Sequence, residues 1–163
     1  MEFTGTATSS VRERAHPMDA AHPTRTESVE VGQYSPHGMR GTVLLIDMDK
    51  LLPVAVDLFR TSGLIVYHCD ELSQALKQFR DIGADVVLVA STHYNSSVIR
   101  AFRALADDAT SVIVASGPEY REEARAAGAD SFLLNLAPPA DLLYEIHRAL
   151  ILRRSGRRLP WHW

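Results

Sequence analysis

The hydrophobic and polar positions divide the chain into a long polar segment and a region of regular alternation. Residues 1–40 hold Ser, Thr, Pro, His and charged residues, with isolated apolar positions and no strand or helix period. Such a segment buries too little apolar surface to offset the entropy of ordering it, so we predict a disordered tail. From Gly41 onward, short apolar runs alternate with stretches whose apolar residues recur every three or four positions.

The short apolar runs predict strands that are buried on both faces. Each run is rich in Val, Ile, Leu or Phe and lacks the polar alternation of a half-exposed strand. The predicted strands are Thr42–Ile46, Leu64–His68, Val86–Ala90, Ser111–Ala115 and Ser131–Leu134.

The segments between and after these runs have the spacing of amphipathic helices. Pro53 suits a first helical turn, Asp70 or Ser73 can cap the second helix, and both Phe102 and Leu105 are expected to point inward in the third. The predicted helices are Leu51–Thr61, a stripe from Leu72 to Phe79 that Gly83 ends, Val98–Ala106, Glu119–Ala127 and Pro139–Arg153.

Five strand–helix units in unbroken succession predict an α/β fold, a doubly wound parallel sheet with helices on both faces. We therefore divide the chain into a tail at residues 1–40, one domain at residues 41–153 and a basic, aromatic tail at residues 154–163. The sequence has neither a Gly-x-Gly-x-x-Gly motif nor a Gly-Lys-Ser/Thr phosphate loop, which disfavours dinucleotide and P-loop enzymes.

Composition narrows the class of protein further. A chain of 163 residues with 46% hydrophobic and 23% charged residues is typical of one soluble globular domain plus tails. A net charge of −3 predicts neither nucleic-acid nor membrane binding by bulk charge. The single cysteine, Cys69, cannot form an internal disulfide and fits a reducing cytoplasm. We find no secretory apolar region and no apolar run long enough for a membrane helix.

The segment from Arg153 onward, RRSGRRLPWHW, places four arginines close to two tryptophans. Cations near a helix C-terminus are favourable, so we expect these residues to complement the last helix and to serve as a partner-docking arm. Nucleic acid is expected at most as a weak ligand of this tail. Too few residues follow Arg153 to build a helix-turn-helix, so any effect on transcription is expected to act through a partner.

Four stretches resemble the receiver domain of bacterial response regulators, the CheY-like module. The resemblance covers about Gly41 to Arg153. It implies a flavodoxin-like five-stranded sheet with strand order 2-1-3-4-5. The matching stretches are VLLIDMD (Val43–Asp49), ADVVLVA (Ala84–Ala90), SVIVAS (Ser111–Ser116) and AAGADSFLLN (Ala126–Asn135).

The resemblance also assigns positions to the phosphorylation site of that family. The family has a phosphoryl-accepting aspartate after the third strand, two Mg²⁺-binding acids after the first, a hydroxyl residue after the fourth and a lysine after the fifth. A switching aromatic residue lies on the fifth strand. The corresponding residues here are Ala90 for the acceptor, Asp47 and Met48 for the acidic pair, Ser116 for the hydroxyl, Asn135 for the lysine and Phe132 for the aromatic.

Three of these positions lack the chemistry that the family needs. Ala90 has no oxygen to attack phosphorus, Met48 offers a soft thioether that Mg²⁺ does not accept, and Asn135 carries no positive charge. We therefore expect a degenerate site that is not enzymatic and that holds no metal or cofactor.

Neighbouring residues offer substitutes that we weigh against this expectation. Asp49 can replace Met48 and hold a weak cation with Asp47, or it can be solvated or cap the first helix. Ser91 points to the opposite side of the strand from Ala90, and a serine ester lacks the lability of an acyl phosphate. His93 has no catalytic partner at a supporting spacing and is expected to be a loop residue.

The leading interpretation is a phosphorylation-independent pseudo-receiver that acts by protein–protein contact in a two-component-type regulatory system. In the family, the fourth helix, fifth strand and fifth helix form the interaction face. Here we expect that face to carry Tyr120, Arg121, Tyr144 and Arg148, for a protein partner or a homodimer.

Two alternatives remain. The first is a small-ligand sensor that uses the vacated pocket, with Ser116, Asn135, Asp47 and Thr92 as polar anchors. The second is a phosphorylated response regulator whose acceptor lies elsewhere on the third strand. The only aspartate there is Asp85, at the start of the strand and therefore at the wrong end of the sheet.

Overall fold

The structure, a computed structural model, describes residues 40–161, so the predicted tail at residues 1–40 lies outside the described residues except for Arg40. Strands and helices alternate along the chain as predicted. The elements are β1 (Thr42–Asp47), α1 (Pro53–Thr61), β2 (Ile65–Cys69), α2 (Leu72–Ile82), β3 (Val86–Ala90), α3 (Ser96–Leu105), β4 (Ser111–Ser116), the 3₁₀ helix η1 (Pro118–Tyr120), α4 (Arg121–Ala127), β5 (Ser131–Leu134) and α5 (Pro139–Arg154).

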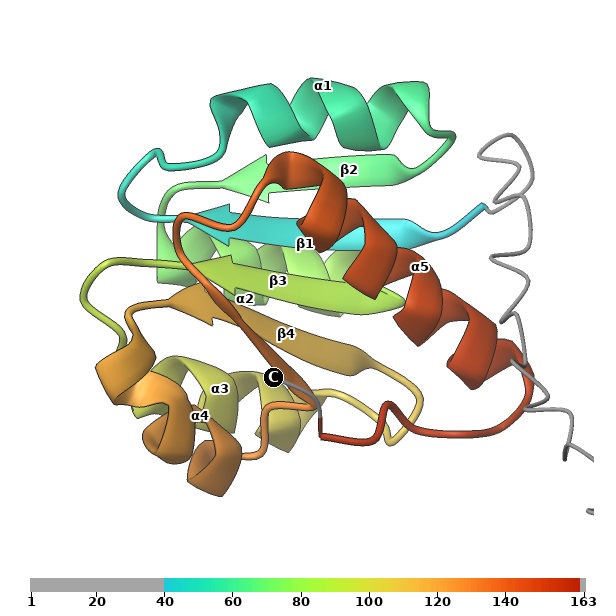
Figure 1. Ribbon diagram of the computed structural model, residues 1–163. Coiled ribbons are helices and arrows are strands. Elements are labelled where there is room, and N and C mark those ends of the chain that lie inside the picture. Colours follow the sequence, from blue (N-terminus) through green and yellow to red (C-terminus); the bar gives the residue numbers. More distant parts are fainter. Residues whose placement is uncertain (1–39, 162–163) are drawn as a thin grey trace, which may run out of the picture. The chain divides into compact units, whose positions relative to one another are not determined.

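The strands form one parallel sheet in the order β2-β1-β3-β4-β5 (Figure 1), which confirms the predicted fold class and strand order. Every residue of β3 and β4 is buried, as expected for strands covered by helices on both faces. The register places Asp47 opposite Ala90 and Ala90 opposite Ala115. The carboxyl ends of the three central strands therefore lie side by side.

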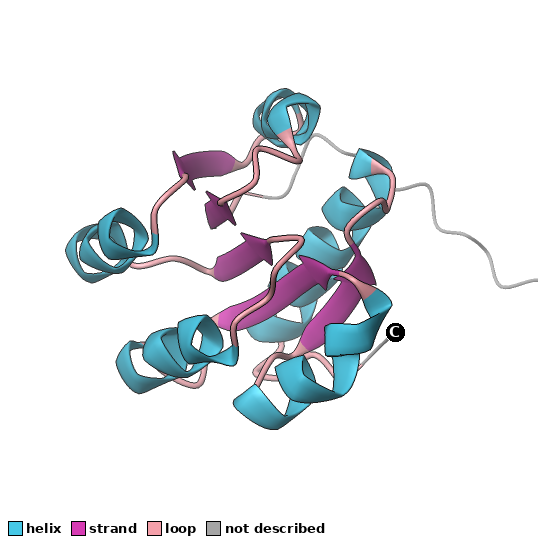
Figure 2. Ribbon diagram, turned by 90° about the vertical axis from the view of Figure 1, so that its left-hand side faces the viewer, coloured by secondary structure: helices cyan, strands magenta, loops and turns pink. Residues whose placement is uncertain are grey.

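Helices cover both faces of the sheet in two layers (Figures 1 and 2). α1 and α5 pack over one face, around a cluster that includes Phe59, Leu88 and Ile146. α2, α3 and α4 pack over the other face, around a cluster that includes Phe79 and Phe102. The two aromatic rings of the second cluster meet edge to face, with centroids 5.5 Å apart.

Several helix ends differ from the predictions. α3 begins at Ser96 because the Asn95 side chain accepts a hydrogen bond from the Ser97 amide at 2.9 Å. The expected inward position of Leu105 is wrong, since this side chain is 38% exposed in the last turn of α3. α2 starts after Glu71 without a side-chain cap from Asp70 or Ser73.

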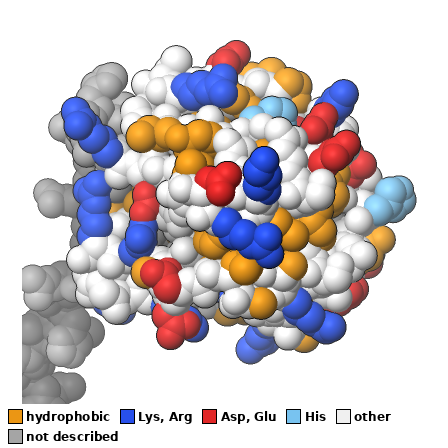
Figure 3. All heavy atoms as spheres, turned by 180° about the vertical axis from the view of Figure 1, so that it is seen from behind, with side chains coloured by type: hydrophobic (Ala, Val, Ile, Leu, Met, Phe, Trp, Pro, Cys, Tyr) orange, Lys and Arg blue, Asp and Glu red, His pale blue; other side chains and the backbone are white. Residues whose placement is uncertain are grey.

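The surface over α2 and α3 carries basic and acidic side chains interspersed with hydrophobic ones (Figure 3). Neither sign of charge dominates this view, which agrees with the small net charge of the sequence. None of the helices in residues 40–161 combines the length and hydrophobicity needed to cross a membrane.

Candidate functional site

The candidate site lies at the carboxyl edge of the sheet, where sites occur in open α/β folds. The structure brings together the predicted positions there, because Asp47, Ala90 and Ser116 each end a strand and Asn135 directly follows β5. The Asn135 amide donates a hydrogen bond to the carbonyl of Ser116 at 2.9 Å. These positions therefore lie together at one edge of the sheet, as predicted.

Ala90 and Met48 contribute apolar atoms to this edge. Ala90 is fully buried and belongs to the cluster beneath α1 and α5. Met48 is partly buried and packs against the cluster on the opposite face. Neither side chain presents an oxygen ligand, so the carboxylates expected at these two positions of an active receiver are replaced by packing.

Asp47 is buried and its carboxylate is used inside the β1–α1 turn. One oxygen accepts the Leu51 amide at 2.7 Å and the other accepts the Leu52 amide at 2.8 Å. The Nε2 atom of His68 lies 4.0 Å from the second oxygen. Asp47 therefore satisfies backbone donors that lie just before α1, which is a structural use of the charge.

Asp49 crosses from the β1–α1 turn to the loop after β3. Its Oδ2 atom accepts three hydrogen bonds, from the Thr92 amide at 2.6 Å, the Thr92 hydroxyl at 2.9 Å and the Ser91 hydroxyl at 3.1 Å. These bonds, chiefly from the Thr92 amide, lower the pKa of the Asp49 carboxyl. Asp49 is exposed, as expected for a solvated residue, but its carboxylate binds the loop after β3 and does not cap α1. We call Asp49, Ser91 and Thr92 the loop latch.

The loop latch continues into β4 through internal hydrogen bonds. The Ser116 hydroxyl donates to the carbonyl of Ser91 at 2.6 Å, and the Ser91 amide donates to the carbonyl of Ala115 at 3.1 Å. The Ser91 hydroxyl also accepts the His93 amide at 3.2 Å. The hydroxyl that the family would place beside a phosphoryl group is thus committed to the backbone.

Sequence reasoning placed Asp47, Ala90, Ser116 and Asn135 at the carboxyl ends of their strands but missed the loop latch. The signal was present as Asp49 in the first loop and Ser91–Thr92 in the third, but their spacing of about forty residues gives no local pattern. Within residues 40–161, no group of three or more His, Cys, Asp or Glu side chains is arranged to hold a metal ion.

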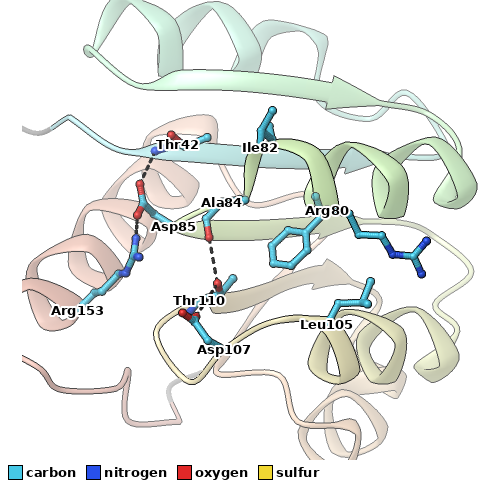
Figure 4. A pocket seen from close by; sticks show the side chains of 11 residues that line it. Thr42, Arg80, Ile82, Ala84, Asp85, Leu105, Asp107, Thr110 and Arg153 are labelled. Atoms are coloured by element: carbon cyan, nitrogen blue, oxygen red, sulfur yellow. Dashed lines mark hydrogen bonds and ion pairs between the residues drawn. The ribbon is translucent and has the colours of Figure 1, made fainter.

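One hollow lies near these residues, and another lies at the opposite edge of the sheet. One, of about 290 Å³, is lined by Asn135 and by apolar residues that include Leu51, Val54 and Leu136. The other, of about 530 Å³, opens at the amino-terminal edge of the sheet (Figure 4). There Asp85 accepts the Thr42 amide at 2.7 Å and pairs with Arg153, so Asp85 joins β3 to α5 far from the acceptor position.

The predicted interaction residues make different contacts within the domain. Tyr144 on α5 is 56% exposed, and Arg148 forms an ion pair with the buried Glu145 at 3.0 Å. The Arg121 guanidinium lies 5.9 Å from the ring centroid of Phe132, which is itself buried. Tyr120 instead packs against Tyr94 on the α3 side, with ring centroids 5.8 Å apart.

Comparison with known proteins supports the fold assignment. No protein-family model matches the sequence. No curated protein matches it either. Solved structures do match: a CheY-like response regulator receiver domain protein from Methanospirillum hungatei gives a TM-score of 0.63 at 17% identity, covering 72% of this chain and 99% of that one.

Two further structures agree with this match. A response regulator from Thermotoga maritima gives a TM-score of 0.61 at 21% identity, covering 69% of this chain and 99% of that one. A response regulator receiver domain protein from Clostridium thermocellum gives 0.62 at 19% identity, covering 71% and 98%. The described part of this chain therefore has the fold of CheY-like response regulator receiver domains.

Proposed function

We propose that this chain is a phosphorylation-independent receiver-like module that acts in the cytoplasm through protein contact, within a two-component-type regulatory system. The observation that carries the proposal is the state of the carboxyl edge. A buried methyl group stands at the acceptor position, and the donors of the following loop are occupied by Asp49. An edge held in this way has no free carboxylate at the end of β3 to accept a phosphoryl group.

The loop latch also explains how such a module keeps one conformation. The Asp49 carboxylate accepts hydrogen bonds from the loop after β3. Because this anion belongs to the chain itself, it is present in every molecule. Charge-assisted hydrogen bonds of this kind are stronger than neutral ones. The loops after β1 and β3 are therefore joined without an added phosphoryl group.

The ligand-sensor alternative is less well supported. Of its four polar anchors, Asp47, Ser116 and Thr92 already make hydrogen bonds within the chain. Asn135 alone of the four lines the nearby hollow, whose other lining residues are mostly apolar. A metabolite would have to break existing bonds to use the other three, which costs free energy that new contacts must replace.

A phosphodonor experiment tests the proposal. Purified protein is incubated with acetyl phosphate and Mg²⁺, followed by intact mass measurement, and its amide NMR spectrum is recorded with beryllium fluoride and Mg²⁺. We expect no added phosphoryl mass and unchanged amide signals for Ala90 to Thr92. A phosphoryl group that tandem mass spectrometry maps to Asp47 or Asp49 would refute phosphorylation independence.

The contact role needs a separate experiment. We expect Tyr144→Ala, which removes an exposed aromatic side chain from α5, to reduce co-purification of a partner from native cells. The matched control is Ile65→Ala on the edge strand β2, where the side chain is also 56% exposed. Equal recovery of the same partner with the two variants would place the contact surface elsewhere.

A further inference from the structure

The residues after α5 turn back along the molecule. Gly156 adopts a left-handed conformation with φ of 67°, and the Arg157 amide donates to the carbonyl of Leu152 at 2.8 Å. This turn reverses the chain at the end of α5, and the chain then runs back below β4 in the view of Figure 1. We call residues 157–161 the strap.

The strap places one side chain in each layer of the domain. Leu159 is 5% exposed and belongs to the cluster beneath α1 and α5. Trp161 packs against the cluster on the opposite face of the sheet, and the Arg125 guanidinium of α4 lies 5.8 Å from its ring centroid. Because β5 is the edge strand, the strap crosses that edge between these two side chains.

Side chains make the contacts that hold the strap beyond its turn. Arg158 pairs with Asp108, although both groups are largely exposed and the pair contributes little. The strap is not a strand of the five-stranded sheet. A segment seated by two apolar anchors and no strand ladder resembles a bound peptide more than an element of the fold.

We propose that the edge of β5 between α4 and α5 is a peptide-binding site, and that the strap is its detachable resident ligand. The site selects an extended segment with an aliphatic residue and, two positions later, an aromatic residue, as Leu159 and Trp161 are placed in the strap. A groove of about 420 Å³ beside Arg121 and Phe132 continues the site toward Leu134 and Leu136. The strap regulates partner access to this face, and that consequence rests on the proposed function.

Peptide binding in trans tests the site. The ligand is a labelled synthetic peptide, SGRRLPWHW, which has the sequence of residues 155–163, and its fluorescence anisotropy is read with full-length protein. Gly156→Pro opens the turn, because proline cannot adopt a positive φ, and it leaves every residue of the site unchanged. Gly156→Asn is the matched control, because asparagine tolerates the left-handed conformation.

We expect the peptide to bind Gly156→Pro at least tenfold more tightly than the wild type or Gly156→Asn, whose own straps occupy the site. A peptide with Leu159→Ser and Trp161→Ser should not bind. A second variant, Leu159→Ser with Trp161→Ser in the full chain, empties the site by another route and should also bind the unmodified peptide. Failure of the peptide to bind either opened protein, or equal binding by the wild type, would overturn the proposal.

The result is independent of the phosphodonor experiment, because the peptide assay contains neither phosphodonor nor Mg²⁺. Phosphorylation of the chain together with tight peptide binding would remove the proposed function and leave this site standing. An inert chain that never binds the peptide would remove this site and leave the proposed function standing.

Discussion

Two aspartates two positions apart, Asp47 and Asp49, take different roles in the turn between β1 and α1. Asp47 turns inward to the amides of Leu51 and Leu52, whereas Asp49 crosses to the loop after β3. Lys50, which follows Asp49, adopts a left-handed conformation with φ of 55°, which is uncommon for a residue with a side chain. No glycine or asparagine marks this turn in the sequence, so the direction of Asp49 was not predictable from residue types.

The first prediction concerns Asp49→Asn. Asparagine keeps one acceptor oxygen but loses the charge that three donors share, so we expect the free energy of unfolding at pH 7 to fall by about 1 kcal/mol. Urea unfolding measures the change. Asp57→Asn, at an exposed position on α1, is the control and should be near neutral. Equal losses for the two variants would mean that the loop latch does not stabilise the fold.

The same variant carries a pH dependence with a fixed sign. The pKa of the Asp49 carboxyl is lower in the folded state than its ordinary value, so its stabilisation is present above that ordinary value. It is lost as pH falls through the lower, folded pKa. The stability difference between wild type and Asp49→Asn should therefore be constant near neutral pH and shrink under acidic conditions. A difference that grows on acidification would contradict this assignment.

The second prediction concerns the acceptor position. Ala90→Asp introduces a carboxylate at the end of β3, and it places a charge in a fully buried position beside buried Asp47. We expect a loss of about 3 kcal/mol at pH 7, because burial and a like charge both disfavour ionisation. Thermal unfolding of Ala90→Asp and of neutral, size-matched Ala90→Asn separates charge from volume.

The stability of Ala90→Asp should depend on pH in the opposite direction to the contribution of Asp49. Burial would raise the folded pKa of the new carboxyl, so its charge penalty should be absent at low pH and grow as pH rises above the unfolded value. The stability gap between the two variants should widen toward neutral pH. A gap that does not change with pH would show that the carboxylate reaches water.

At the scale of elements, apolar runs predicted β3 and β5 with their final bounds, because strands covered on both faces need continuous hydrophobic residues. Helix ends were less predictable. The start of α3 depends on one hydrogen bond that the Asn95 side chain accepts. Two serines separate Asn95 from the first apolar residue of the helix, Val98. Leu105 fits the helical period, but it falls in the last turn, at the rim of the cavity at the amino-terminal edge.

The third prediction tests that helix start. Asn95→Ala removes the acceptor for the Ser97 amide, and we expect a loss of about 1 kcal/mol in the free energy of unfolding. Asn95→Asp is the matched control, since aspartate also accepts at this position and should retain most of the stability. If both variants lose the same amount, the amide of Ser97 finds another partner and the cap is unimportant.

At the scale of the whole molecule, the last described residues pack back onto the domain. Composition marked residues 154–163 as a basic, aromatic tail, and a docking arm was the expected role. The tail has no strand or helix period, so nothing local predicts that Leu159 is buried in the core. That contact depends on the turn at Gly156 and on the open edge of β5, which exist only once the sheet has formed.

The fourth prediction measures what this closure contributes. Leu159→Ala removes most of a side chain that is buried in the cluster beneath α1 and α5. We expect the free energy of unfolding to fall by about 2 kcal/mol. This value is at the low end for core leucines because the strap can adjust. Urea unfolding of Pro160→Ala, a change at the exposed neighbouring position, supplies the control and should differ little from wild type. If Leu159→Ala were as stable as Pro160→Ala, the strap would add no stability to the domain, and Leu159 would be a passive cover rather than an anchor.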